Sequence, residues 1–179
     1  MPVKQLKDFL DEHQVQYVSI QHSPSFTSRE IAESTHIDTN ALAKTVVINM
    51  DGTLAMLVLP CSYRVRWDRL QDEMATDFIS MAEEEEFKDR FPDCEIGALP
   101  PFGNLYDMPV YCYEALEQAD RMAFSAGTHS EIIQMDYADY IHLVNPVILS
   151  KGFIRKGSKR PKWLRRKKTS SVAKLAWSL

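Results

Sequence analysis

Apolar residues recur at helical spacing at the beginning of the chain and predict an amphipathic first helix over residues 3–13. The short β-rich run 15–20 predicts a strand after it. The proline-containing segment 21–26 predicts a loop, because the residue before a proline avoids the helical region. Thr27 and Glu30 have the spacing of a capping box, which predicts a second helix through Thr35.

The clearest local signal is a hairpin between Ala43 and Pro60. Two apolar runs, 44–50 and 53–59, flank the dipeptide Asp51-Gly52. Asp-Gly between apolar strands is among the strongest short-range hairpin signals. Both runs are apolar almost without interruption, so we expect the two strands in the centre of a sheet that is covered on both faces.

Shorter elements follow the hairpin. Periodicity predicts a helix over 65–74, and the acidic run 83–86 opens another helix that ends before Pro92. Asp136 is placed to cap a last helix ending near Leu143, and Pro146 begins the exit from the domain. The glycine- and proline-rich segment 97–103 predicts a loop. Strands are predicted over 77–81, 108–113, 122–125 and 131–135.

The size of the chain, 179 residues with 45% hydrophobic composition, suits one globular domain of about 150 residues plus a tail. No run of 18 apolar residues occurs, which argues against a membrane partner, and the first residues lack the apolar core of a signal peptide. Cys61, Cys94 and Cys112 lie far apart, without the spacing of a zinc site, and are interpreted as small buried hydrophobes. We therefore expect a cytoplasmic protein that uses no metal and no cofactor.

Charge divides the chain into two opposite segments. Residues 1–150 carry 25 acids and 10 lysines and arginines, whereas residues 151–179 carry 11 lysines and arginines and no acid. Gly152, Gly157 and Pro161 predict little regular structure in the basic segment. Such a segment commonly binds nucleic acid, although it could also fold back on the acidic body or be merely solvated. The candidate nucleic-acid-binding residues are Lys159, Arg160, Lys162, Arg165, Arg166, Lys167 and Lys168.

Three segments carry the candidate chemistry: Lys44 ahead of its apolar run, the loop 97–103, and the segment 125–130. If the fold brings them together, they supply one positive charge and several free backbone N–H groups around one pocket. That set suits binding of an ester or carboxylate and stabilisation of an oxyanion. His129 in the third segment could orient water, contact an ammonium group or shape the pocket, or could be a solvated or capping group.

On these three motifs the chain resembles the YbaK and prolyl-tRNA-synthetase-associated domain family. The matching features are Lys44 at the head of the hairpin, the G-x-x-x-P loop from Gly97 to Pro101, and the A-G-T-H-S-E segment around His129. The resemblance covers residues 1–146 and leaves 147–179 as a basic C-terminal extension. It implies an α+β fold in which a mixed, mostly antiparallel sheet curls into a partial barrel with helices outside.

The resemblance also implies a chemistry, the hydrolysis of mischarged aminoacyl-tRNA by attack of water on the aminoacyl ester. Lys44 is then the central charged residue, and backbone N–H groups at Gly97 and Gly127 are expected to face the ester carbonyl. A partner aminoacyl-tRNA synthetase is left open, as is the oligomeric state. The residues expected to contact the substrate are Thr45, Pro100, Ser125, Thr128 and His129.

Other functions remain as alternatives. A non-catalytic module that binds tRNA or a synthetase would keep the fold and lose turnover. An esterase of another class is disfavoured because the sequence has no G-x-S-x-G motif, and metal-dependent hydrolysis because it has no ligand cluster. Pro100-Pro101 in series and Tyr113 depart from the family pattern. These departures leave the amino acid and the tRNA undetermined.

Overall fold

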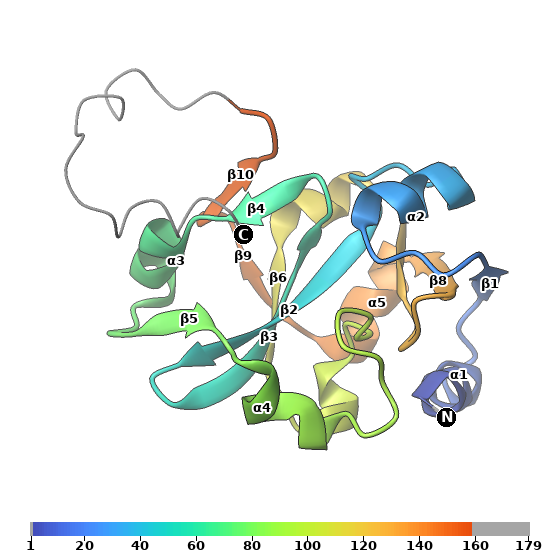
Figure 1. Ribbon diagram of the computed structural model, residues 1–179, viewed down its shortest axis with the longest axis horizontal. Helices are drawn as coiled ribbons and strands as arrows, with labels where there is room; N and C mark the ends of the chain where they lie inside the picture. Colours follow the sequence, from blue (N-terminus) through green and yellow to red (C-terminus); the bar gives the residue numbers. More distant parts are fainter. Residues whose placement is uncertain (1, 159–179) are drawn as a thin grey trace.

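A computed structural model describes residues 2–158 of the chain (Figure 1). The strands form three sheets that do not close, and both parallel and antiparallel neighbours occur. This arrangement confirms the expected α+β class with a mixed, mostly antiparallel sheet. The predicted nucleic-acid-binding residues between 159 and 168 lie outside the described residues. No helix within 2–158 is long and apolar enough to cross a membrane.

The predicted hairpin is the centre of a five-stranded sheet with the order β5-β2-β3-β6-β9. β2 (Ala43–Met50) and β3 (Thr53–Pro60) pair antiparallel from Ala43 opposite Pro60 to Met50 opposite Thr53. Alternate residues of β3 enter two different cores, with Met56 and Val58 in one and Leu57 in the other. The sheet is therefore covered on both faces, as the apolar runs predicted. Its other strands are β5 (Ile79–Met81), β6 (Val110–Tyr113) and β9 (Val147–Leu149).

A three-stranded antiparallel sheet, β1-β8-β7, lies beside the first. It comprises β1 (Tyr17–Gln21), β7 (Arg121–Ser125) and β8 (Glu131–Asp136). An isolated parallel bridge from Leu42 to Ala123 connects it to the start of the hairpin. This bridge places the turn between β7 and β8 near the first residues of β2.

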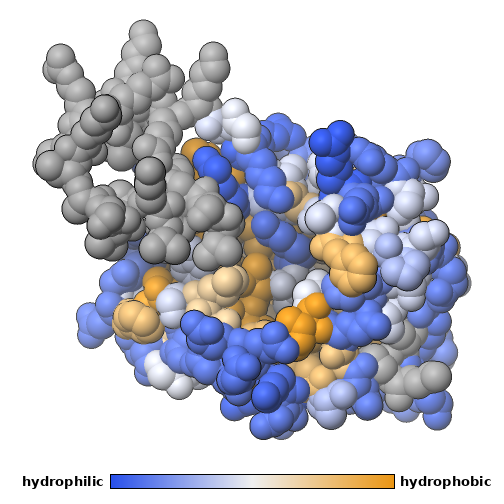
Figure 2. Space-filling model, in the orientation of Figure 1, coloured by the Kyte–Doolittle hydropathy of each residue, from blue (hydrophilic) through white to orange (hydrophobic). Residues whose placement is uncertain are grey.

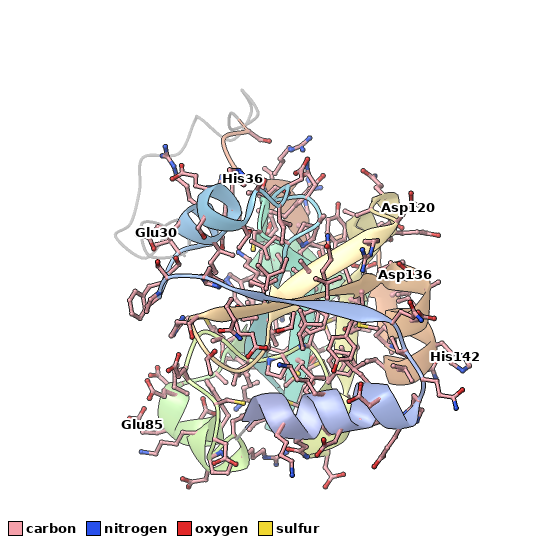
Figure 3. The ribbon with its side chains drawn as sticks, turned by 90° about the vertical axis from the view of Figure 1, so that its right-hand side faces the viewer. Glu30, His36, Glu85, Asp120, Asp136 and His142 are labelled. Atoms are coloured by element: carbon pink, nitrogen blue, oxygen red, sulfur yellow. The ribbon has the colours of Figure 1, made fainter. Side chains whose placement is uncertain are left out.

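Five α-helices within the described residues surround the sheets: α1 (Pro2–Glu12), α2 (Ser28–Thr35), α3 (Trp67–Met74), α4 (Glu84–Phe87) and α5 (Tyr137–Val144). The capping box is confirmed, because the side chains of Thr27 and Glu30 each accept the other's backbone N–H. Figure 3 shows α1 below β1, with polar side chains around the outside of the molecule. The labelled exposed residues are Glu30, His36, Glu85, Asp120, Asp136 and His142.

Short 3₁₀ turns, at Lys88–Arg90, Gly103–Tyr106 and Glu114–Gln118, connect several of these elements. The second of them requires glycine at its first residue. A Cβ on Gly103 would lie 2.3 Å from the carbonyl oxygen of Met108, closer than real Cβ atoms approach. The loop that begins at Gly97 is thereby held tightly at its far end.

Two short strands lie past residue 146, where the sequence predicted the end of the domain. β9 extends the five-stranded sheet by pairing parallel with β6, and β10 (Phe153–Arg155) pairs antiparallel with β4 (Tyr63–Val65). The predicted helix over 65–74 therefore begins two residues later, at Trp67. The sequence showed neither β4 nor β10, since a three-residue strand depends on its distant partner rather than on local propensity.

Candidate active site

Lys44 is the second residue of β2, opposite Leu59, and its partly buried side chain enters a small cavity of about 60 Å³. The cavity lies where the hairpin, the start of α2 and the two glycine-bearing loops meet. Its lining residues are Phe26, Ser28, Ile31, Leu42, Ala43, Lys44, Thr45, Cys61, Gly97, Leu99, Ser125 and His129.

The structure brings together most of the residues expected at the site. Lys44, Thr45, Gly97, Ser125 and His129 all line this one cavity, although they come from three separate parts of the chain. The other three expected residues do not line it; they are Pro100, Gly127 and Thr128. The spatial convergence on which the sequence hypothesis depended is therefore present.

Gly127 has a different role from the one predicted for it. Its backbone N–H donates to the carbonyl oxygen of Ala98 at 2.9 Å, and its own carbonyl accepts from the N–H of Glu95 at 2.8 Å. An N–H used in this way is not free to face a substrate. Gly127, with a φ of +100°, instead ties the loop after Gly97 to the turn between β7 and β8.

Both the backbone and the ring of His129 are held by other residues. Its backbone N–H donates to Oε2 of Glu95 at 2.6 Å, and its Nε2 lies 2.9 Å from the carbonyl oxygen of Ile96. A carbonyl oxygen only accepts, so Nε2 carries the proton and cannot act there as a base. The ring also packs against the 75% exposed Phe26, with ring centroids 4.7 Å apart. These contacts fit a residue that shapes the cavity wall.

Gly97 presents the free backbone donor that the sequence argument required. It adopts a φ of +87°, which favours glycine, and an added Cβ would lie 3.4 Å from Cε1 of His129. Within residues 2–158 its N–H donates to no other group. Gly97 thus combines an uncommitted N–H with a place in the lining that it shares with Lys44.

Burial shifts the pKa values of Lys44 and Cys61 in the cavity. It lowers the pKa of Lys44 from 10.5 to about 8, with a further lowering from the positive charge of Lys156. Burial raises the pKa of the Cys61 thiol, an effect that hydrogen bonding from Ser28 and the charge of Lys44 only partly oppose. At neutral pH the cavity therefore holds a charged lysine and a protonated thiol.

Sequence reasoning missed several lining residues: Phe26, Ser28, Ile31 and Cys61. The hairpin register contained a signal for Cys61. Because Ala43 pairs with Pro60, the next residue after Pro60 must lie close to the beginning of β2. The other three depend on how α2 packs over the hairpin, which no local pattern in the sequence shows.

The comparisons with known proteins give the family of this site. A model of the aminoacyl-tRNA editing domain matches residues 22–143, which include every residue that lines the cavity. The chain belongs to the aminoacyl-tRNA editing domain family. This match confirms the resemblance to the YbaK family that the three motifs indicated.

Solved structures show the same fold as this editing domain. The hypothetical protein APE2540 is 12% identical, with a TM-score of 0.73 over 82% of this chain and 97% of that one. A candidate trans-editing enzyme for prolyl tRNA synthetase is 16% identical, with a TM-score of 0.72 over 87% of this chain and 98% of that one. A comparison with curated proteins gives no match.

The cavity of the editing domain opens beside a wider apolar groove of about 340 Å³. Thr45, Gly97 and Leu99 line both the cavity and the groove. Met81 and Ile96, which also line the groove, are 45% and 38% exposed. Figure 2 shows apolar side chains gathered in the middle of this face between polar regions. The site thus consists of a narrow, partly polar cavity and an adjoining apolar surface.

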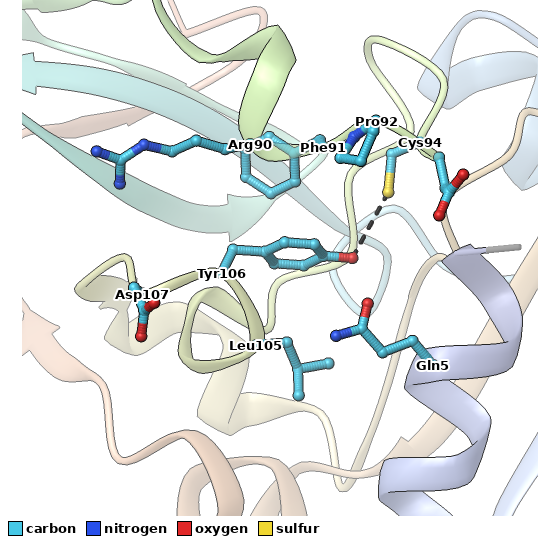
Figure 4. A pocket seen from close by; sticks show the side chains of 9 residues that line it. Gln5, Arg90, Phe91, Pro92, Cys94, Leu105, Tyr106 and Asp107 are labelled. Atoms are coloured by element: carbon cyan, nitrogen blue, oxygen red, sulfur yellow. Dashed lines mark hydrogen bonds between the residues drawn. The ribbon is translucent and has the colours of Figure 1, made fainter.

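A larger cavity of about 600 Å³ lies elsewhere in the editing domain, between α1 and the segments 90–94 and 105–107 (Figure 4). Inside it the thiol of Cys94 lies 3.6 Å from the hydroxyl of Tyr106. Burial raises the pKa of both groups, so neither is a nucleophile at neutral pH. None of the site residues expected from the sequence lines this cavity.

Proposed function

We propose that this editing domain acts in trans and hydrolyses the ester bond that joins a wrong amino acid to its tRNA. The observation that carries the proposal is the single cavity that Lys44, Gly97 and His129 line together, with the N–H of Gly97 uncommitted among the described residues. The family supports aminoacyl-tRNA as the substrate. The name of the prolyl-tRNA-synthetase neighbour makes tRNA for proline the first substrate to test.

In the proposed reaction the ester carbonyl lies in the cavity with its oxygen toward Gly97. Water adds to the carbonyl carbon, and the negative charge that forms on the oxygen is stabilised by the Gly97 N–H and the Lys44 ammonium. The bond from carbon to the ribose oxygen then breaks, and that oxygen takes the proton that the attacking water releases. The products are a free amino acid and uncharged tRNA. Because Nε2 of His129 is already protonated and bound to Ile96, we assign His129 a positioning role.

The dimensions of the site indicate which part of the substrate lies where. The cavity has a volume of about 60 Å³. One buried water needs about 10–15 Å³, so the cavity has room for a group of only a few heavy atoms. We therefore place a small acyl group there. The apolar groove, at about 340 Å³, lies within the usual range for a small-ligand site, and we place the terminal nucleoside in it.

The decisive experiment is deacylation of a panel of mischarged tRNAs by the wild type and Lys44→Ala. We expect turnover of small acyl groups and a loss of about 10²–10³-fold in kcat/KM in the variant, the size typical of removing an oxyanion stabiliser. Lys4→Ala is the matched control, since Lys4 is exposed on α1, where it forms a salt bridge with Asp8. Binding without turnover on every substrate would instead indicate a non-catalytic tRNA- or synthetase-binding module.

The basic extension is proposed to bind the body of the tRNA. A cut after Ser150 would remove β10, which pairs with β4, so the informative truncation is after Ser158. It should raise KM for full-length tRNA and flatten the dependence of KM on salt, because fewer counterions are released. An unchanged KM would contradict this assignment of residues 159–168.

A further inference from the structure

A second lysine lies beside the cavity of Lys44, in a position that the fold of the C-terminal segment determines. β10 pairs with β4 so that Arg155 lies opposite Tyr63. The next residue, Lys156, donates its backbone N–H to the carbonyl oxygen of Ser62 at 2.8 Å. Ser62 follows Cys61, which lines the cavity. Figure 1 shows β10 alongside β4. The pairing of β10 with β4 thus places the beginning of the basic segment at the edge of the site.

The positive charge of Lys156 is close enough to act on two side chains that line the cavity, Lys44 and Cys61. It is one of the two causes that lower the pKa of Lys44, and it also favours the charged form of the Cys61 thiol. The side chain of Lys156 is exposed, and within residues 2–158 no carboxylate forms a salt bridge with it. Two like charges near one another, with no acid between them among the described residues, favour an anion at this place.

Arg155 supplies a fixed cation next to Lys156. Its Nη2 donates to Oδ1 of Asn40 at 2.8 Å, and its guanidinium carbon lies 5.9 Å from the centre of the Tyr63 ring. The same Oδ1 accepts from the hydroxyl of Ser62 at 2.8 Å. One hydrogen bond uses one of five guanidinium N–H donors, so the others remain for a ligand. The arrangement combines a held guanidinium with a flexible ammonium, the two groups that bind phosphate in proteins.

We propose that Arg155 and Lys156 bind the phosphodiester that precedes the terminal nucleoside of the aminoacyl-tRNA while the ester lies in the Lys44 cavity. This inference rests on the proposed function, because it assumes that the ester enters that cavity. Both residues belong to the segment beyond the match to the editing domain, which ends at residue 143. They are positioning residues that hold the substrate and take no part in breaking the ester bond.

The test compares two substrates with the same acyl group, an aminoacyl-tRNA and an aminoacyl-adenosine that has no phosphate. Lys156→Ala should raise KM for the aminoacyl-tRNA about 3–10-fold and reduce the slope of log KM against log salt by about one. The increase in KM should be absent with aminoacyl-adenosine. Lys156→Arg should restore the wild-type KM, which separates a charge effect from a folding defect.

Lys151→Ala is the matched control. It removes the same charge from the same segment, but its backbone N–H binds the carboxylate of Glu73, on α3, rather than a group beside the cavity. This variant should keep the wild-type KM and salt slope. An equal effect in Lys151→Ala, an equal effect of Lys156→Ala on aminoacyl-adenosine, or no change in KM would each overturn the proposal.

The inference and the proposed function fail in different ways. If the wild type hydrolyses mischarged tRNA and Lys156→Ala behaves like the wild type, only the phosphate assignment is wrong. If the wild type hydrolyses no substrate, the proposed function is wrong. In that case the salt slope of direct tRNA binding, measured for the wild type, Lys156→Ala and Lys151→Ala, still decides whether Lys156 contacts phosphate.

Discussion

Lys44 on β2 and Cys61, the residue that directly follows β3, line the same cavity, and burial there shifts the pKa values of the two side chains in opposite directions. Burial lowers the pKa of the lysine to about 8 and raises that of the thiol. The lysine near the thiol does not convert it to a thiolate, because burial is the larger effect. A cysteine nucleophile is therefore not part of the proposed chemistry.

Replacement of Cys61 tests this conclusion. Cys61→Ala and Cys61→Ser should keep kcat within about tenfold of the wild type, whereas removal of a true nucleophile costs on the order of 10⁶-fold. Steady-state deacylation assays measure the difference. Slow reaction of Cys61 with iodoacetamide at pH 7 in the wild-type protein would agree with a protonated thiol. A large loss of kcat in either variant would refute the conclusion that Cys61 is not a nucleophile.

The pH dependence of the reaction should report the charge of Lys44. If the ammonium stabilises the oxyanion, kcat/KM should be level below pH 8 and fall about tenfold per pH unit above it. Lys156→Ala should move the midpoint to higher pH, because it removes a like charge. The uncatalysed ester hydrolysis at each pH is the control. A rate that instead rises through pH 8 would show that the neutral amine acts as a base.

The same lysine should cost the protein stability. Its pKa is lowered on folding, so at pH 7 the folded state pays to keep it charged, and Lys44→Met should raise the free energy of unfolding by about 1–3 kcal/mol. Between pH 8 and 10.5 the unfolded wild type binds more protons than the folded one, so wild-type stability rises with pH in this window. The advantage of Lys44→Met should shrink across it.

Urea unfolding at pH 7 and pH 10 measures this effect. Lys4→Met, at an exposed position on α1, is the control and should change stability little at either pH. An advantage of Lys44→Met that stays the same at both pH values would mean that the gain comes from packing and not from charge.

The size of the cavity predicts how acyl specificity can be changed. Ile31→Ala removes a lining side chain of α2 and should raise the ratio of kcat/KM for leucyl-tRNA over alanyl-tRNA by about 10–200-fold. The variant should also lose about 2–5 kcal/mol of stability. Ile37→Ala is the control, because Ile37 packs against the same apolar cluster but does not line the cavity. An unchanged ratio would contradict the proposal that the acyl group binds in this cavity.

Local signals in the sequence predicted the parts of the fold that local physics determines. The Asp-Gly turn placed the hairpin at the observed bounds, and the capping box began α2 at the right residue. β4 and β10 could not be predicted, since each exists through pairing with a segment about ninety residues away. The same limit applies to Lys156, whose place beside Lys44 follows from that pairing.

The candidate site divides in the same way. Residue types and motif order were enough to predict that Lys44 and Gly97 lie at one site. The role of Gly127 was not accessible, because a glycine in a turn looks the same whether its N–H is free or bonded to Ala98. Only the folded arrangement of two distant loops distinguishes the two cases.

Hydrogen bonds that involve Glu95, Ala98, Gly127 and His129 connect the segment around Gly97 to the turn between β7 and β8. A residue inserted in one loop would shift its hydrogen-bonding groups away from their partners in the other loop. New substrate preferences should therefore arise here by exchange of side chains and not by changes of loop length. The conformational entropy of both loops is lost when the chain folds. Binding of an ester therefore carries little further cost for ordering these loops.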